Sequence, residues 1–133
     1  MHHPWHALRA LHDWTLTIAP LPAGTRGLTH WPSLTITLRP GLTQAQRRSV
    51  LAHELVHVER GPFPPGWEWQ EEQRVRVLAA RRLIPLDRLI DAVRWTEDPA
   101  EMADELWVDE AVLRDRLDHL QPWEMDAIVA AID

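Results

Sequence analysis

The chain has no cysteine, no tyrosine and no lysine among its 133 residues, and it has a single phenylalanine. The lack of cysteine excludes disulfides and thiolate zinc sites. All 14 basic residues are arginines and the formal net charge is −6, which argues against nonspecific nucleic-acid binding, because phosphates attract a basic surface. No apolar run is long enough to span a bilayer, and residues 1–5 lack the layout of a signal peptide. We therefore expect a cytoplasmic protein without membrane contact.

The composition is that of a folded globular chain. Hydrophobic residues make up 45% and charged residues 26% of the sequence. A chain of this length predicts one domain over residues 1–133. We expect three parts in it: a short helix and small sheet over 1–42, metal-binding helices over 43–85, and C-terminal helices packed on the core over 86–133.

The most informative motif is His53-Glu54-Leu55-Val56-His57, an H-E-x-x-H sequence. Side chains four residues apart lie on one face of a helix, so the two imidazoles can share one metal ion, most commonly Zn²⁺. Glu54 lies beside them and is expected to take a proton from a metal-bound water and to pass it later to the leaving amine. The pattern predicts His53 and His57 as zinc ligands and Glu54 as the catalytic residue.

The surrounding residues favour a helix around this motif. Thr43 and Gln46 form a capping box at its expected start. Gly61, followed by Pro62, is a typical helix end. Apolar residues within the run require burial, so the histidines are expected on a largely buried helix.

A zinc hydrolase needs a third protein ligand and an open position for water. The metzincin pattern is excluded, because Arg60 and Phe63 stand where it requires glycine and histidine. A remote histidine, His30 or His119, stays open as the third ligand. The other route is a carboxylate from a following helix, which a short loop would return alongside the first. The carboxylates there are Glu68, Glu71 and Glu72.

Residues 43–85 resemble the ImmA/IrrE family of zinc metallopeptidases, in which H-E-x-x-H is followed by a helix reading E-x-x-A-N-x-F-A-x-x-L-L-M-P. Aligning the proline with Pro85 places Glu72 on the family's ligand glutamate, and Arg76 replaces the usual asparagine. The resemblance thus implies Glu72 as the third ligand. Glu72 also lies on one helical stripe with Ala79 and Leu83, which points it to the packed side. Glu71 and Glu68 are the alternatives, and Glu68 could instead orient a ligand imidazole.

The other segments complete an α+β fold. Residues 4–11 predict a short helix, and residues 14–18, 26–31 and 33–39 predict strands. We expect a three-stranded antiparallel sheet, covered on one face by the metal-binding helix and followed by helices only. Pro85, Pro99 and Pro122 each fit a helix start.

The sheet suggests how a peptide could bind. An edge strand can pair with an extended substrate, and either the third or the second strand would be that edge. Without tyrosine, a histidine, an arginine or the metal must polarise the scissile carbonyl; His30 and Arg39 lie near strand ends. Most histidine and arginine side chains near strand ends, however, are solvated surface groups without a catalytic role. Phe63, Trp67 and Trp69 could line a substrate pocket.

Residues 102–117 resemble a helix-turn-helix with Asp109 at the start of the second helix. That helix begins Asp109-Glu110 and mixes acids with its arginines, so we expect it to pack against the core rather than to read DNA.

Together these features predict a zinc-dependent endopeptidase. The resemblance implies a regulatory substrate, typically a transcriptional repressor carrying its own helix-turn-helix, and small regulatory peptidases often need an activating partner protein. The rival hypothesis is a non-catalytic module that sequesters a repressor or contacts DNA through the tail. A third is zinc-dependent hydrolysis of a non-peptide amide.

Overall fold

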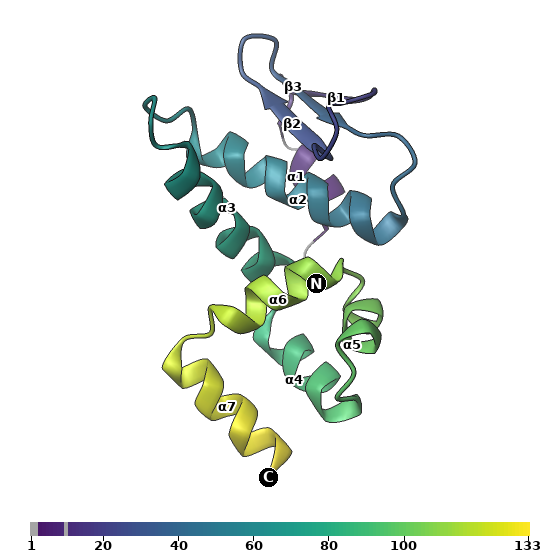
Figure 1. The fold of residues 1–133 in the computed structure, drawn as a ribbon, viewed down its shortest axis with the longest axis vertical. Helices are drawn as coiled ribbons and strands as arrows, with labels where there is room; N and C mark the ends of the chain where they lie inside the picture. Colours follow the sequence, from purple (N-terminus) through teal and green to yellow (C-terminus); the bar gives the residue numbers. More distant parts are fainter. Residues whose placement is uncertain (1–2, 10) are drawn as a thin grey trace.

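The computed structural model describes residues 3–9 and 11–133. The fold is α+β, as predicted, with a three-stranded sheet and only helices after it (Figure 1). The predicted first helix included residue 10, which lies outside the described residues. The elements are, in order, α1 (Pro4–Arg9), β1 (Thr15–Ile18), β2 (Gly27–His30), β3 (Thr35–Leu38), α2 (Gln44–Arg60), α3 (Glu68–Leu83), α4 (Leu86–Trp95), α5 (Pro99–Leu106), α6 (Glu110–Asp118) and α7 (Pro122–Ile132).

The sheet is mixed, so the prediction of a purely antiparallel sheet was wrong. Its strand order is β1-β3-β2, with β3 antiparallel to β2 and parallel to β1. The reason lies in the connection over residues 19–26, which is long enough to pass the chain across two strand spacings before β2 begins. The short turn after β2 then returns β3 into the space between them. The third strand is therefore central, and β2 is an edge.

Helix α2 begins and ends as its sequence predicts. The Thr43 hydroxyl accepts a hydrogen bond from the Gln46 backbone N–H at 3.1 Å, and the Gln46 side chain accepts one from the Thr43 N–H at 2.9 Å. Gly61 ends the helix with a φ of 86°, in the left-handed region that glycine tolerates best. The buried face of α2 packs on the sheet through a core of Ile36, Leu38, Leu51 and Leu55.

Helix α3 returns alongside α2, because the loop over residues 61–67 is short. In Figure 1 the two helices lie next to each other beneath the sheet. A second apolar cluster joins them through Val56, Val75 and Ala79. His53 and His57 lie in the C-terminal half of α2 and Glu72 lies in the N-terminal half of α3, so the short loop between the helices brings these positions near one another.

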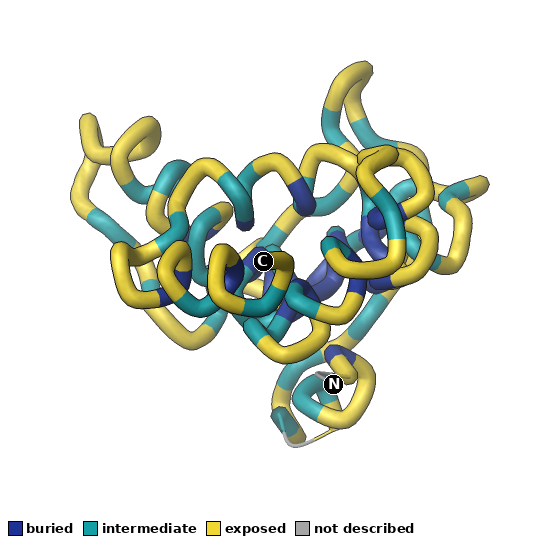
Figure 2. The backbone as a smooth tube through the Cα atoms, turned by 90° about the horizontal axis from the view of Figure 1, so that it is seen from below, coloured by how far each residue is buried: buried dark blue, intermediate teal, exposed yellow. Residues whose placement is uncertain are grey.

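The C-terminal helices form the lower part of the molecule in Figure 1. Pro85 precedes α4, while Pro99 and Pro122 are the first residues of α5 and α7, as predicted. Their apolar faces meet in the largest cluster, which includes Leu83, Leu89 and other residues of α4 to α7. Figure 2 shows the buried positions where the helices meet, while the loops are exposed. No helix in the described part of the chain is long and apolar enough to cross a membrane.

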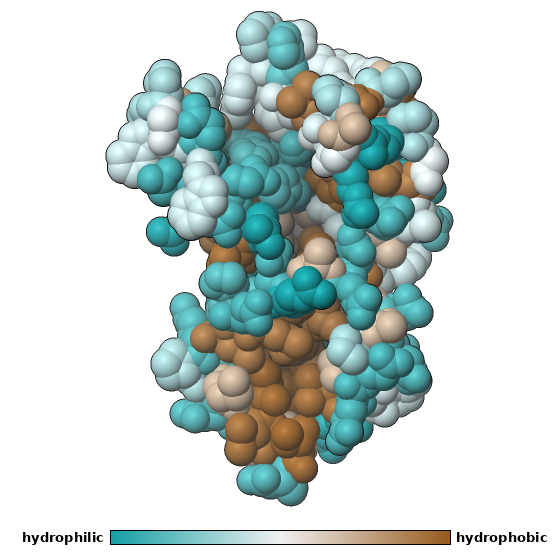
Figure 3. Space-filling view, viewed as in Figure 1, coloured by the Kyte–Doolittle hydropathy of each residue, from teal (hydrophilic) through white to brown (hydrophobic). Residues whose placement is uncertain are grey.

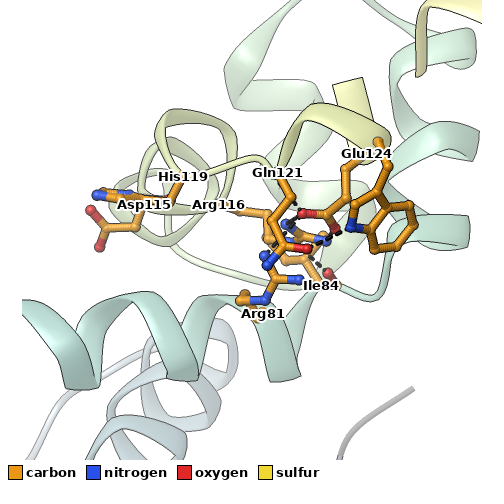
Figure 4. A network of polar contacts seen from close by, with 8 residues as sticks. Arg81, Ile84, Asp115, Arg116, His119, Gln121 and Glu124 are labelled. Atoms are coloured by element: carbon orange, nitrogen blue, oxygen red, sulfur yellow. Dashed lines mark hydrogen bonds and ion pairs between the residues drawn. The ribbon is translucent and has the colours of Figure 1, made fainter. Parts of the chain in front are cut away.

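A buried ion pair ties the last two helices to α3. Arg116 Nη2 donates to Glu124 Oε2 at 2.5 Å, and Arg116 Nε donates to the Ile84 carbonyl at 2.8 Å (Figure 4). Arg81 Nη1 donates to Glu124 Oε1 at 2.9 Å, and the Gln121 N–H donates to the same oxygen at 3.0 Å. The hydrogen bond from Arg116 helps to lower the pKa of Glu124 to about 2, which keeps this carboxylate ionised.

A second buried arginine ties the α5–α6 turn to α2. Arg48 is 4% exposed, and its guanidinium donates to the carbonyls of Trp107 at 2.9 Å and of Leu83 at 3.3 Å. Trp107 has a φ of 62°, so it adopts the left-handed conformation at a position where such turns usually have glycine. The helix-turn-helix-like segment is thus packed on the core, as predicted.

Candidate metal centre

The two motif histidines lie on one face of α2, as their spacing predicts. Their ring centroids are 5.0 Å apart, and the rings are inclined by 66°. Both side chains are partly exposed, with fractions of 24% for His53 and 16% for His57. They lie at the surface of a cleft, where a ligand or an ion can reach their Nε2 atoms.

Glu72 reaches across from α3 and meets both imidazoles. Its Oε1 lies 2.7 Å from His53 Nε2, and its Oε2 lies 3.0 Å from His57 Nε2. Hydrogen bonds from the two imidazoles hold the pKa of Glu72 well below its usual range. Burial alone would lower the pKa of His57, but the hydrogen bond to Glu72 and the nearby carboxylates raise it above its ordinary value.

These three residues form a group of the kind that holds a metal ion. One ligand atom from each lies within 4.8 Å of the others. Two imidazole nitrogens and a carboxylate oxygen are the donor set of many catalytic zinc sites, and three protein ligands leave one position free. The donors present therefore fit Zn²⁺. In the described part of the chain, no other His, Asp and Glu side chains form such a group.

Glu54 lies beside this group and is nearly buried, with an exposed fraction of 5%. It lines the same cleft, and its Oε2 has no hydrogen-bond partner. Burial raises the pKa of Glu54 above its ordinary value. The backbone of β2 closes over it at Gly27, where an added Cβ would lie 3.1 Å from Glu54 Cγ. A buried, unsatisfied carboxylate oxygen facing a cleft is costly in a merely structural role.

The alternative glutamates are engaged elsewhere. Glu71 forms an ion pair with Arg60, with Arg60 Nε donating to Glu71 Oε1 at 2.5 Å. Glu68 accepts a hydrogen bond from the Gly66 N–H at 3.2 Å, next to the start of α3. Neither belongs to the group around the two imidazoles. Of the three glutamates, α3 presents Glu72 to the histidines.

The centre opens into a cleft of about 710 Å³ between β2, α2 and the N-terminal end of α6. Phe63 lines this cleft, as expected of the aromatic cluster. Trp67 and Trp69 do not, and they are 56% and 72% exposed on the loop and the first turn of α3. The cleft lies along the edge strand β2, which leaves its outer backbone groups open to an extended chain.

The more remote candidates lie outside the cleft lining. His30 contacts Ser33 at 2.7 Å in the turn after β2, and Arg39 donates to the Pro22 carbonyl at 2.7 Å. His119 lies 2.9 Å from the Asp115 carbonyl at the end of α6. None of the three is among the described residues that line the cleft.

The cleft also contains charged residues that sequence reasoning missed. Arg26 and Asp109 form an ion pair of 2.6 Å across it, although they are 83 positions apart. Asp109 is the N-cap residue of α6, as predicted, but its side chain pairs with Arg26 and makes no capping hydrogen bond to the helix. Ser49 also lines the cleft, and it lies one turn before His53 on the same face of α2, so helical periodicity could have identified it from the sequence. No local sequence pattern could have identified Arg26 and Asp109.

Comparison with known proteins agrees with this geometry. A family model described as the IrrE N-terminal-like domain, of the Peptidase M78 type, matches residues 11–118. No curated protein and no solved structure matches the chain. The matched stretch runs from before the sheet to the end of α6 and includes His53, His57 and Glu72. It covers far more than half of the chain, so the protein belongs to the IrrE N-terminal-like family of peptidases.

Proposed function

We propose that the protein is a zinc-dependent endopeptidase, with His53, His57 and Glu72 as metal ligands and Glu54 as the catalytic residue. The observation that carries this proposal is the convergence of three donor groups from α2 and α3 at one point of an open cleft. The peptidase family supports the class of reaction, and the donor set supports the metal.

Each residue has a separate task in this mechanism. The two imidazoles and the Glu72 carboxylate would hold the ion, and a bound ion would supply Lewis-acid chemistry by lowering the pKa of a water and polarising a carbonyl. Glu54 accepts the proton of the attacking water and returns it to the leaving nitrogen of the cleaved peptide bond. Its position next to both imidazoles supports this role, because a general base must lie within reach of the proton it takes.

The proposed substrate is an extended segment of a regulatory protein, such as a transcriptional repressor. Two features support an extended peptide: β2 is an edge strand, and the cleft runs along it. The repressor class rests on the family resemblance, as does an activating partner that positions the target. We place the activity in the cytoplasm, in keeping with the absence of cysteine.

The α5–α6 segment is proposed to have a structural role and not to read DNA. Arg116 is buried against Glu124, so it cannot reach a groove. The second helix begins with acidic residues, and Asp109 is already paired with Arg26. A DNA reader needs basic and amide side chains at these positions.

Metal analysis and a matched set of variants test the proposal. The purified protein should contain one equivalent of zinc and cleave members of a mixed peptide library, read by mass spectrometry. His57→Ala should lose both zinc and cleavage, while Glu54→Gln should keep zinc and lose cleavage by a factor of about 10² or more. His119→Ala is the control, because His119 lies outside the centre, and it should behave as the wild type.

Three results would contradict the proposal. Cleavage by Glu54→Gln at the wild-type rate would show that Glu54 has no catalytic role. Zinc binding and full biological activity in that variant, with no cleavage by either protein, would favour the non-catalytic module that sequesters its target. Cleavage of simple amides but not of peptides would favour the non-peptide hydrolase.

A further inference from the structure

The start of α3 carries Glu72, but apolar packing does not hold it. The first buried side chain of α3 is Val75, one turn after Glu72, and the apolar cluster shared with α2 begins there. Trp67, the N-cap residue, makes no capping hydrogen bond with its side chain. Figure 3 shows mainly hydrophilic to neutral residues over the surface where Figure 1 places this end of the helix. Polar contacts therefore have to fix the position of Glu72.

One ion pair joins this end of α3 to the last turn of α2. Arg60 Nε donates to Glu71 Oε1 at 2.5 Å, and Arg60 Nη2 donates to Glu71 Oε2 at 3.0 Å, so the contact is bidentate. The Glu71 side chain is largely covered, with an exposed fraction of 12%. A bidentate pair fixes direction as well as distance, because both the guanidinium and the carboxylate are planar. The ion pair therefore sets both the position and the rotation of the first turns of α3 relative to α2.

The ion pair lies next to the proposed ligands on both helices. Arg60 follows His57 by three residues, so both side chains point from α2 towards α3. Glu71 directly precedes Glu72, so a shift of the helix at Glu71 also moves the Glu72 carboxylate. That carboxylate meets the two imidazoles at 2.7 Å and 3.0 Å. A binding group of this kind must be held to within about 0.5 Å of its working geometry.

We propose that Arg60 and Glu71 are positioning residues of the metal centre. Their ion pair holds the start of α3 so that Glu72 faces both imidazoles. It also engages the carboxylate of Glu71, so that Glu72 is the one of two adjacent glutamates presented as a ligand. This inference rests on the proposed zinc site, and it adds two residues that are not among the described residues lining the cleft. Replacing residues that orient metal ligands typically weakens metal binding about 10- to 100-fold.

Zinc affinity, measured on the full chain by competition with a chelator, tests the proposal. Glu71→Gln and Arg60→Gln should each weaken Zn²⁺ binding at least about tenfold. The matched control is Arg82→Gln, which removes an ion pair between Arg82 and Glu59 on the same two helices, at the far end of α3. This control should leave the zinc affinity unchanged. Circular dichroism checks that each variant is folded.

Two readouts separate positioning from a general loss of stability. In excess zinc, a tenfold weaker affinity reduces the stabilisation of the fold by zinc by about 1.4 kcal/mol. A merely structural ion pair would instead lower the unfolding free energy of the zinc-free and the zinc-loaded protein equally. The second readout is the double variant Arg60→Gln/Glu71→Gln, which should bind zinc no more weakly than either single variant, because both changes remove the same contact.

The outcomes distinguish this inference from the proposed function. Unchanged zinc affinity in both single variants, with one equivalent bound by the wild type, would overturn the positioning role alone. A strictly additive loss in the double variant would also overturn it, because Arg60 and Glu71 would not then act as a pair. Failure of the wild type to bind zinc would overturn the metal centre and this inference together. Zinc binding weakened as expected, without peptide cleavage by the wild type, would support the positioning role and contradict the peptidase.

Discussion

Gly27 of β2 lies close against helix α2, and replacing it with alanine should disturb both the strand and the helix. An added Cβ would lie 2.5 Å from Val50 Cγ1 and 3.1 Å from Glu54 Cγ. Ordinary van der Waals contacts begin near 3.4 Å. The distance of 2.5 Å to Val50 Cγ1 falls short of that value by about 0.9 Å, so β2 and α2 must separate by about this amount at Val50. Val50 is β-branched and lies on a packed helix, so its side chain has few other rotamers.

Overpacking of this size costs about 1–3 kcal/mol of unfolding free energy. In a chain of this length that corresponds to a fall in Tm of roughly 3–5 °C for each kcal/mol. The loss of peptidase activity should exceed the loss that unfolding alone would cause. The reason is that the displaced strand β2 lies both behind Glu54 and along the edge of the cleft. Zinc content should be unchanged, because all three proposed ligands lie on α2 and α3.

The assays are thermal unfolding, zinc analysis and cleavage of the peptide library. Combining Gly27→Ala with Val50→Ala removes the closest contact, so the two changes together should cost less than the sum of their separate effects. Wild-type stability and activity in Gly27→Ala alone would refute the close approach of β2 to α2. Strict additivity with Val50→Ala would refute Val50 as the obstacle.

Three further predictions concern other parts of the fold. The pKa of Glu124 is lowered to about 2, so the ionised carboxylate contributes roughly 3 kcal/mol to the unfolding free energy. This contribution is present above about pH 5 and is lost as the pH falls towards 2. The difference in unfolding free energy between the wild type and Glu124→Gln should shrink over that range, and a constant difference would contradict the pKa. Thr43→Ala removes one half of the capping box and should cost about 1 kcal/mol in denaturant unfolding, with zinc content unchanged. Asp109→Asn weakens a partly exposed ion pair with Arg26 and should change stability by less than about 1 kcal/mol, whereas a larger loss in chemical denaturation would show that the pair holds the cleft together.

The local chemistry of the centre could be read directly from the sequence. Whether a helix forms, and which side chains share its face, depends on near neighbours, so Thr43, His53, His57 and Gly61 were enough to predict α2 and its two histidines. Glu72 required more, namely a resemblance that set the register of α3. The packing of α3 against α2 then places that carboxylate 2.7 Å and 3.0 Å from the imidazoles.

Other features depend on contacts between residues far apart in the chain, and no local pattern encodes them. The position of β3 between β1 and β2 depends on how far the 19–26 connection travels before it turns back. The pairing of Arg26 with Asp109 arises only because α6 packs beside the cleft. The ion pair of Arg116 and Glu124 forms because helices α6 and α7 meet over α3. By itself, then, the sequence determined the helices and the chemistry on their faces, since these follow from backbone periodicity. Tertiary structure alone decided which strand is central and which charges meet, since these follow from packing.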